Sequence, residues 1–192
     1  MNQTIPKVIF LFSGKRKTGK DYVTDVLNNK LSSNGSIIIR LSGPLKYEYA
    51  KINQLDSDKL YSASSYKEKY REDMVKWSEE IRAKDDSYFL KAALKMYNAF
   101  EYPIWIVSDM RRLSDLAWFK KEYNHIIITV RITASEETRF KRGFVFTPNI
   151  DDAETECNLD FYNEWDYIFP NEDGIDEKLN EFIDLLCKRA LA

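Results

Sequence analysis

Residues 8–21 read VIFLFSGKRKTGKD, so an unbroken apolar run leads directly into a loop of glycines and basic residues. The run at 8–12 is short and contains β-branched and aromatic side chains, which favours a strand that is buried on both faces. The loop has the spacing G-x-x-x-x-G-K. Apolar side chains then recur at helical spacing, at Val23, Val26, Leu27 and Leu31. A strand, a glycine loop and a helix in this order are typical of a phosphate-binding loop.

The chemistry of a nucleoside triphosphate explains this spacing. Glycines allow the backbone N–H groups to turn inward, and the N-terminus of the following helix adds partial positive charge. Lys20 would reach the β- and γ-phosphates, whereas Asp21 stands where Ser or Thr is usual and would face Mg²⁺ directly or through water. The alternative is a surface turn that carries two glycines and a lysine at this spacing by chance. The strand before the loop and the helix after it favour phosphate binding.

Further apolar runs and helical periods alternate along the chain. Runs at 37–39, 104–107 and 126–130, with a weaker one at 167–169, predict additional buried strands. Helical periods occur at 66–81, 89–97 and 175–186. We expect one domain over residues 1–192, a three-layer α/β fold whose parallel sheet is covered by helices on both faces. In such sheets ligands bind beyond the carboxyl ends of the strands.

Charge is distributed unevenly along the chain. The net charge is only −2, but residues 1–150 hold 26 basic and 18 acidic side chains, and residues 151–192 hold 3 basic and 13 acidic ones. An anionic ligand is therefore sought in the first part. The near-neutral total gives no argument for a nucleic-acid partner, and no apolar run approaches the roughly 20 residues of a membrane span. Cys157 and Cys187 suit a reducing cytosol, and we expect a cytosolic monomer with small-molecule substrates.

Polar residues follow the third apolar run, where Asp109, Arg111 and Arg112 occur together. An acid at the end of a strand beside the loop strand commonly helps to hold Mg²⁺, although Asp109 could instead cap the next helix. The two arginines could grip a phosphorylated acceptor bidentately. Solvent exposure at a helix start is the alternative, but cations are unfavourable at that end of a helix dipole.

Arginines also follow the fourth run. Arg131 closes this strand, and Arg139 and Arg142 lie about one helical turn apart in a short helix that leads into an irregular stretch. Residues 135–150 would form a lid that brings guanidinium groups over the transferring phosphate. Spacing alone leaves Arg71 and Arg82, in the helical segment at 66–81 and at its end, undecided between solvent and ligand.

Several strings in this chain resemble the animal-type phosphomevalonate kinases. The similarity extends from about residue 7 to the C-terminal helix. It is carried by residues 13–21, 41–46, 66–68, 107–112, 142–148 and 151–154. The resemblance implies a P-loop kinase fold like that of nucleoside monophosphate kinases, with a five-stranded parallel sheet and a lid. It also implies transfer of the γ-phosphate of ATP, with Mg²⁺, to (R)-5-phosphomevalonate, giving (R)-5-diphosphomevalonate and ADP in isoprenoid and sterol biosynthesis.

The resemblance also implies roles for individual residues. The loop from Gly14, with Lys15, Arg16, Lys17, Thr18, Gly19, Lys20 and Asp21, would bind ATP, and the family likewise carries Asp at the last of these positions. Lys20 would be essential, and the cationic shell around donor and acceptor would comprise Arg82, Arg111, Arg112, Arg131, Arg139 and Arg142. Asn171 matches a substrate-binding position, whereas Glu172 departs from relatives that can carry His there.

These implications lead to specific expectations. Catalytic roles are expected for Lys20, Arg111 and Arg142, and metal ligation for Asp21 and Asp109. Two other functions fit the sequence. One is a kinase of the same architecture acting on a nucleoside monophosphate. The other is a non-catalytic ATP-binding module whose acidic tail docks a partner.

Overall fold

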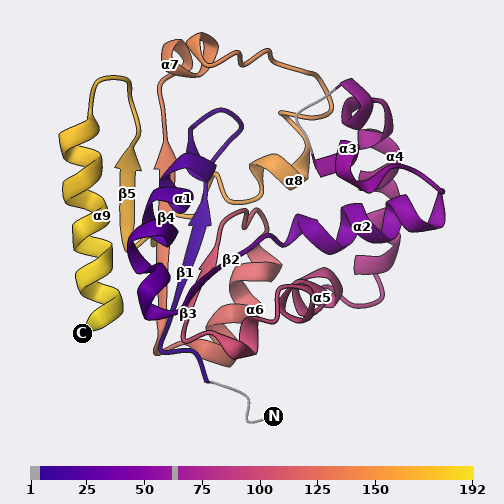
Figure 1. Ribbon diagram of the computed structural model, residues 1–192. Coiled ribbons are helices and arrows are strands. Elements are labelled where there is room, and N and C mark those ends of the chain that lie inside the picture. The colour runs from indigo at the N-terminus through magenta and orange to yellow at the C-terminus, as the bar shows by residue number, and fades with distance from the viewer. Residues whose placement is uncertain (1–4, 62–64) are drawn as a thin grey trace.

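The computed structural model describes residues 5–61 and 65–192 and contains one sheet of five parallel strands, in the spatial order β2-β3-β1-β4-β5 (Figure 1). The strands are β1 (Val8–Ser13), β2 (Ser36–Ile39), β3 (Ile104–Val107), β4 (Ile127–Thr133) and β5 (Tyr167–Pro170). The predicted five-stranded parallel sheet is confirmed. Because all strands point the same way, the residues that follow them meet at one edge.

The central strand β1 explains why its sequence is apolar without alternation. Phe10 and Phe12 face one side of the sheet and Ile9 and Leu11 face the other, and all four are fully buried. Two neighbours flank the strand, since Phe10 is in register with Ile106 of β3 and Ile128 of β4. β1 therefore has no exposed face or edge, and its loop emerges in the middle of the carboxyl edge.

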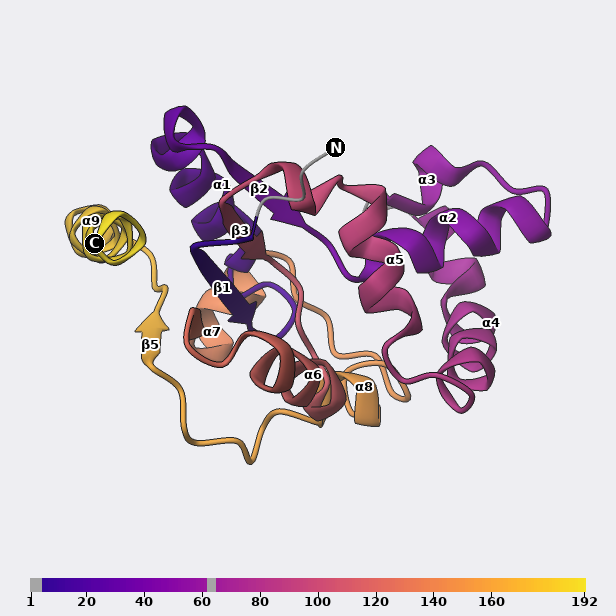
Figure 2. The same cartoon turned by 90° about the horizontal axis from the view of Figure 1, so that it is seen from below.

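Helices cover both faces of the sheet, as the alternation predicted. On one face α1 (Lys20–Leu31) and α9 (Asp176–Leu191) pack through Leu27, Ile183 and other buried side chains. On the other face lie α5 (Tyr88–Met96) and α6 (Leu113–Tyr123) (Figure 2). Short 3-10 turns, η1 (Ser32–Asn34) and η2 (Ala99–Glu101), precede β2 and β3.

A helical lobe extends beside the sheet and has its own small core. It consists of α2 (Ser42–Ile52), α3 (Ser57–Tyr61) and α4 (Ser65–Arg82), with Tyr49, Leu60 and Met74 buried between them. The sequence predicted α4 but neither α2 nor α3. Residues 43–44 are Gly-Pro, a pair that usually marks a turn, yet proline is tolerated here because it lies in the first turn of α2.

The segment after β4 crosses the carboxyl edge of the sheet. It contains α7 (Glu136–Lys141), an irregular stretch, and α8 (Glu154–Cys157), which lies between the sheet and the helical lobe in Figure 1. The side chain of Ser135 caps α7 by accepting a hydrogen bond from the Thr138 N–H at 3.2 Å. The predicted short helix and loop are confirmed. β4, however, runs two residues beyond Arg131, because residues 130–133 pair with β5.

None of the helices in the described part of the chain is long and apolar enough to span a membrane.

Candidate active site

The phosphate loop turns tightly between β1 and α1, and both of its glycines are required by the geometry. Gly19 has a φ of +81°, and a Cβ there would meet the Asn171 side chain at 2.2 Å. A Cβ on Gly14 would lie 2.7 Å from the carbonyl oxygen of Ile132. Thr18 stabilises the turn, since its hydroxyl donates to the Lys15 carbonyl at 2.9 Å. The loop therefore ends at the N-terminus of α1, where an anion is favoured.

Three side chains hold this loop from outside through its carbonyl groups. Arg139 Nε donates to the Arg16 carbonyl at 2.9 Å, and Arg142 Nη1 donates to the Thr18 carbonyl at 3.2 Å. Asn171 Nδ2 donates to the same Thr18 carbonyl at 2.8 Å and is buried. The structure thus places both predicted lid arginines and Asn171 against the phosphate loop.

Glu172 also has a clear place beside the loop. Its carboxylate accepts hydrogen bonds from the Ser135 N–H at 2.6 Å and from the hydroxyl of Thr138. These bonds attach the end of β5 to the first turn of α7, where a negative charge is favourable. The residue that departs from the family pattern therefore stabilises the predicted lid helix.

Lys20 and Asp21 form an ion pair at the start of α1. The Lys20 side chain is only 8% exposed, and its Nζ lies 2.8 Å from Asp21 Oδ1. Burial raises the pKa of Asp21, but the Lys20 ammonium, with help from Arg40 and Arg111, outweighs it and lowers this pKa below its usual value. Asp21 is therefore ionised at neutral pH beside the lysine that the motif assigns to phosphate binding.

A cavity of about 460 Å³ opens between this edge of the sheet and the helical lobe. Part of its wall is apolar, from Leu41, Leu45, Met74, Val75 and Ile150. Charged side chains of both signs also line it. The basic ones are Lys46, Arg71, Lys76, Arg82, Arg111 and Arg112, and the acidic ones are Glu68, Glu72, Asp109, Asp115 and Glu156. A cavity of this kind suits a small acceptor that carries anionic groups on a hydrocarbon skeleton.

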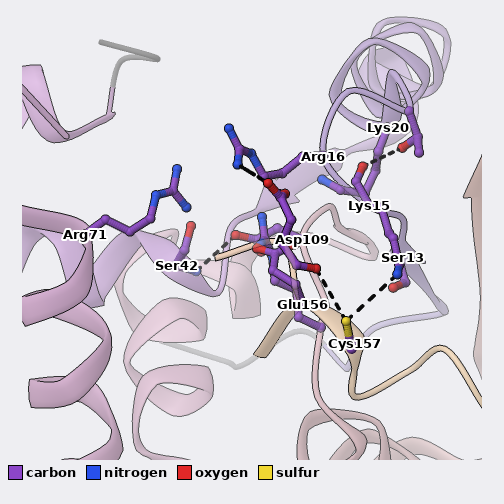
Figure 3. Close-up of polar contacts among 12 residues, drawn as sticks. Ser13, Lys15, Arg16, Lys20, Ser42, Arg71, Asp109, Glu156 and Cys157 are labelled. Carbon is purple, nitrogen blue, oxygen red and sulfur yellow. Dashed lines mark hydrogen bonds and ion pairs between the residues drawn. The ribbon is translucent and has the colours of Figure 1, made fainter. Parts of the chain in front are cut away.

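Lys46 and Arg71 are among the cations that the sequence did not assign to the site. Burial lowers the pKa of Lys46, with Asp109 opposing that effect. Arg71 projects from α4 and faces Arg16 of the loop in Figure 3, so that the helical lobe and the phosphate loop approach one another there. The sequence does contain a pattern that could have assigned Arg71 to the site. Arg71 lies 11 residues before Arg82, which is about three helical turns, so the two residues lie on the same face of α4.

Asp109 holds a different helix from the one that the sequence suggested. Its carboxylate accepts hydrogen bonds from the backbone N–H groups of Leu41 at 2.6 Å and Ser42 at 3.1 Å, at the start of α2. The reason is topological, since β3 and β2 are neighbours and end side by side. Asp109 therefore links the end of β3 to the helical lobe, and it also lines the cavity.

Residues 151–160, which we call the acidic segment, supply counter-ions to the site. Asp151 pairs with Arg16 at 2.9 Å, and Glu156 pairs with Arg111. Asp160 contacts two cations, Lys15 at 2.5 Å and Arg131 at 2.9 Å. The uneven charge distribution of the sequence thus has a local meaning, because the acids of this segment neutralise cations of the phosphate site.

Replacing Asp160 with Asn is expected to tighten anion binding, because it frees two cations from one carboxylate. The dissociation constant for inorganic tripolyphosphate, measured by calorimetry at low salt, should fall about two- to fivefold. Asp152→Asn removes the same charge from an exposed position in the same segment and serves as the control. Equal affinity in the two variants would show that Asp160 does not compete with bound anions.

The sheet order, the glycine loop after β1 and the arginine-lined cavity at the carboxyl edge define a P-loop phosphotransferase. A family model described as phosphomevalonate kinase matches residues 12–125. A Drosophila melanogaster protein named phosphomevalonate kinase is 44% identical over 184 residues, which cover 94% of this chain and 95% of the relative. The chain belongs to the phosphomevalonate kinase family, as its motifs predicted.

Solved structures of more distant proteins show the same fold. A Thermus thermophilus protein designated TT1252 has a TM-score of 0.53 at 14% identity, covering 96% of this chain and 98% of its own. A protein designated APE1195 has a TM-score of 0.52 at 12% identity, covering 98% of this chain and 99% of its own. At these identities the likeness concerns the fold alone.

Proposed function

We propose that the chain transfers the γ-phosphate of ATP to (R)-5-phosphomevalonate, giving (R)-5-diphosphomevalonate and ADP. The observation that carries this proposal is the position of the acceptor cavity. The cavity lies at the same edge of the sheet as the phosphate loop, and Arg111 connects the two regions. Arg111 lines the cavity, and the charges of Asp21 and Arg16 of the loop and of Arg71 of the helical lobe all act on it.

On the donor side, the loop residues and Lys20 bind the triphosphate. The N-terminus of α1 and the buried Lys20 favour the β- and γ-phosphates, while Lys15 and Arg16 exchange their carboxylate partners for phosphate oxygens. Arg142 donates to the Thr18 carbonyl of the loop and pairs with Asp173, and in this proposal it acts on the same phosphates. Arg139 and Asn171 keep the loop in shape through its carbonyl groups.

On the acceptor side, the cavity binds phosphomevalonate. Its guanidinium and ammonium groups attract the phosphate and carboxylate of the acceptor, and its apolar wall accommodates the methyl-bearing carbon skeleton. A phosphate monoester is already largely ionised near neutral pH, because its second pKa is about 6. The attacking oxygen therefore needs no strong general base. Arg111 and Arg112 hold that oxygen in line with the γ-phosphate.

Mg²⁺ is proposed as the metal that accompanies ATP. The oxygen ligands fit this ion, since it is usually held by one or two carboxylates together with phosphates and water. Asp21 offers an ionised carboxylate beside the loop, and Asp109 retains lone pairs beyond the two that accept backbone N–H groups. When bound, the ion would neutralise charge on the β- and γ-phosphates. The described residues contain no group of three or more His, Cys, Asp or Glu of the kind that holds a metal alone.

Arg131 has a supporting role in this proposal. It donates to the Ser13 hydroxyl at 2.9 Å and pairs with Asp160, so it fixes the end of β1 where the loop begins. We also propose that the protein works as a monomer in a reducing compartment such as the cytosol. Cys157 and Cys187 are free thiols, which suits that environment.

Product analysis tests the reaction directly. The protein is incubated with ATP, Mg²⁺ and phosphomevalonate, and phosphorus NMR follows the appearance of a diphosphate ester and ADP in equal amounts. Parallel reactions contain AMP, CMP, GMP or UMP as acceptors. We expect turnover with phosphomevalonate and a rate at least about 10²-fold lower with any nucleotide. A nucleoside monophosphate would leave charged groups of the cavity without hydrogen-bond partners. Preferred turnover of a nucleotide would reassign the acceptor, and ATP binding without ADP formation would favour the non-catalytic module.

A further inference from the structure

Two buried charged residues lie at the wall of the acceptor cavity. Arg82 ends α4 and is 9% exposed, and Asp115 lies in the first turn of α6 and is 4% exposed. Arg82 Nη1 lies 3.6 Å from Asp115 Oδ1. Both residues line the cavity, so this pair joins the helical lobe to the helix that follows Arg111 and Arg112.

The Arg82 guanidinium is incompletely satisfied in this position. Its Nη1 donates to the Asp86 carbonyl at 3.3 Å, and its central carbon lies 5.2 Å from the centre of the Phe89 ring. Among the residues that the structure describes, its Nε is buried and has no hydrogen-bond partner. A guanidinium has five N–H donors, and a buried donor without an acceptor is costly. Arg82 also lines the cavity, so an anionic group that enters there would meet a guanidinium whose donors are incompletely paired.

Burial also acts on both charges of the pair. It lowers the pKa of Arg82, and Asp115 opposes that shift. It raises the pKa of Asp115 to about 6, against the influence of Arg82 and Arg112. Each charge is therefore favoured by the other. Asp109 also acts on Asp115, but its carboxylate is bonded to the start of α2.

The neighbouring Arg112 has a more exposed partner than Arg82 has. Arg112 is held by Glu79, a partner whose side chain is 45% exposed at the surface of α4. Asp115, in contrast, contacts Arg82 from inside the molecule. A carboxylate in that place contacts the guanidinium from the interior side of the cavity wall. The remaining N–H donors can then bind a group in the cavity.

We propose that Asp115 is a positioning residue for acceptor binding: it holds the Arg82 guanidinium against the Phe89 ring, so that Arg82 presents its free donors to an anionic group of the acceptor. Asp115 acts through Arg82 and does not itself touch the acceptor. The proposal rests on the proposed function, because it takes the cavity to be the acceptor site. It differs from a purely structural role, in which the pair would only brace α4 against α6.

The test is a double-mutant cycle on acceptor affinity. Asp115→Asn keeps the shape of the side chain and removes its charge. We expect the KM for phosphomevalonate to rise about 10-fold or more, with the KM for ATP within about twofold and kcat within a few-fold of the parent. In an Arg82→Met background the same substitution should change the acceptor KM by less than about threefold. Glu79→Gln, which removes the exposed partner of Arg112, serves as a matched comparison and should have the smaller effect.

Other outcomes would overturn the proposal. An unchanged acceptor KM in Asp115→Asn, with or without a lower melting temperature, would make the pair a structural brace. An equal rise in both backgrounds would mean that Asp115 acts independently of Arg82. If Asp115→Asn does not fold, Asp115→Ser takes its place in the cycle, and failure of both beside a folded Arg82→Met would also show a role independent of Arg82. The unmodified protein distinguishes this proposal from the proposed function. The proposed function is wrong only if the unmodified protein forms no diphosphate, whereas the role of Asp115 is tested by the variants.

Discussion

Replacing Lys20 with Met is expected to lower kcat by about 10²–10³-fold, the loss typical of one removed transition-state donor. The Lys20 side chain is 8% exposed and lies at the N-terminus of α1, where its charge acts on the phosphates with little screening by water. Methionine has a similar length and no charge, so the packing against the loop is retained. The substitution also removes one of the cations that lower the pKa of Asp21 and leaves Arg40 and Arg111 to oppose the effect of burial.

Steady-state kinetics with saturating ATP measures this effect, and circular dichroism confirms that the fold is kept. Lys30→Met is the matched control. Lys30 belongs to the same helix, but it is exposed and pairs with Asp184 of α9, away from the loop. Its kcat should equal that of the parent. If Lys20→Met retained kcat within a few-fold, residues 14–21 would not be the site of phosphate transfer.

The elements that could be predicted from the sequence are those whose residues carry a local signal. β1 is buried on both faces, so its sequence is continuously apolar. The glycines after it are required by close contacts with Ile132 and Asn171 and, at Gly19, by a positive φ. α4 and α9 show helical periods because each packs one face against a core. α2 was missed because the Gly43-Pro44 pair at its start resembles a turn.

The parts of the site that could not be predicted depend on which elements become neighbours. Asp109 bonds to the start of α2, some 67 residues earlier in the chain, because β2 lies beside β3. The sequence gives the acid and the strand end but not the neighbouring strand. Lys46 likewise joins the site only because α2 turns along the edge of the cavity. Asp115 gave no signal at all, since an acid in the first turn of a helix is common on exposed surfaces.

The ion-pair partners of the acidic segment likewise could not be predicted from the sequence. The sequence showed an excess of acids after residue 150, and one hypothesis was an acidic tail that docks a partner. In the structure Asp151, Glu156 and Asp160 instead pair with cations of the site. Counting charges along the chain reveals the excess of acidic residues. Which cations these acids pair with depends on the path of the acidic segment over the edge of the sheet, which brings it to the phosphate loop and to Arg111.

Arg111 is expected to give the largest loss of all, because it lines the proposed acceptor cavity and also lies within the electrostatic influence of the phosphate loop. Burial lowers its pKa, and the charges of Asp109, Arg71, Asp21 and Arg16 all act on it. An arginine that neutralises a transferring phosphate contributes about 10³–10⁵-fold to kcat. We therefore expect Arg111→Met to lower kcat by this factor, while the KM for ATP changes by less than about 10-fold, since the loop and Lys20 still bind the nucleotide.

Single-turnover measurements with saturating substrates separate this chemical effect from binding, and calorimetry gives the affinity for ATP in the same variant. Arg189→Met, an exposed arginine in the last turn of α9, is the control and should leave kcat unchanged. Arg111→Lys sharpens the result. It keeps the charge but loses the planar fork, so a kcat between those of the parent and Arg111→Met would mean that both charge and geometry matter. A loss confined to the acceptor KM would instead place Arg111 in binding alone, because an interaction made equally before and during transfer does not change kcat.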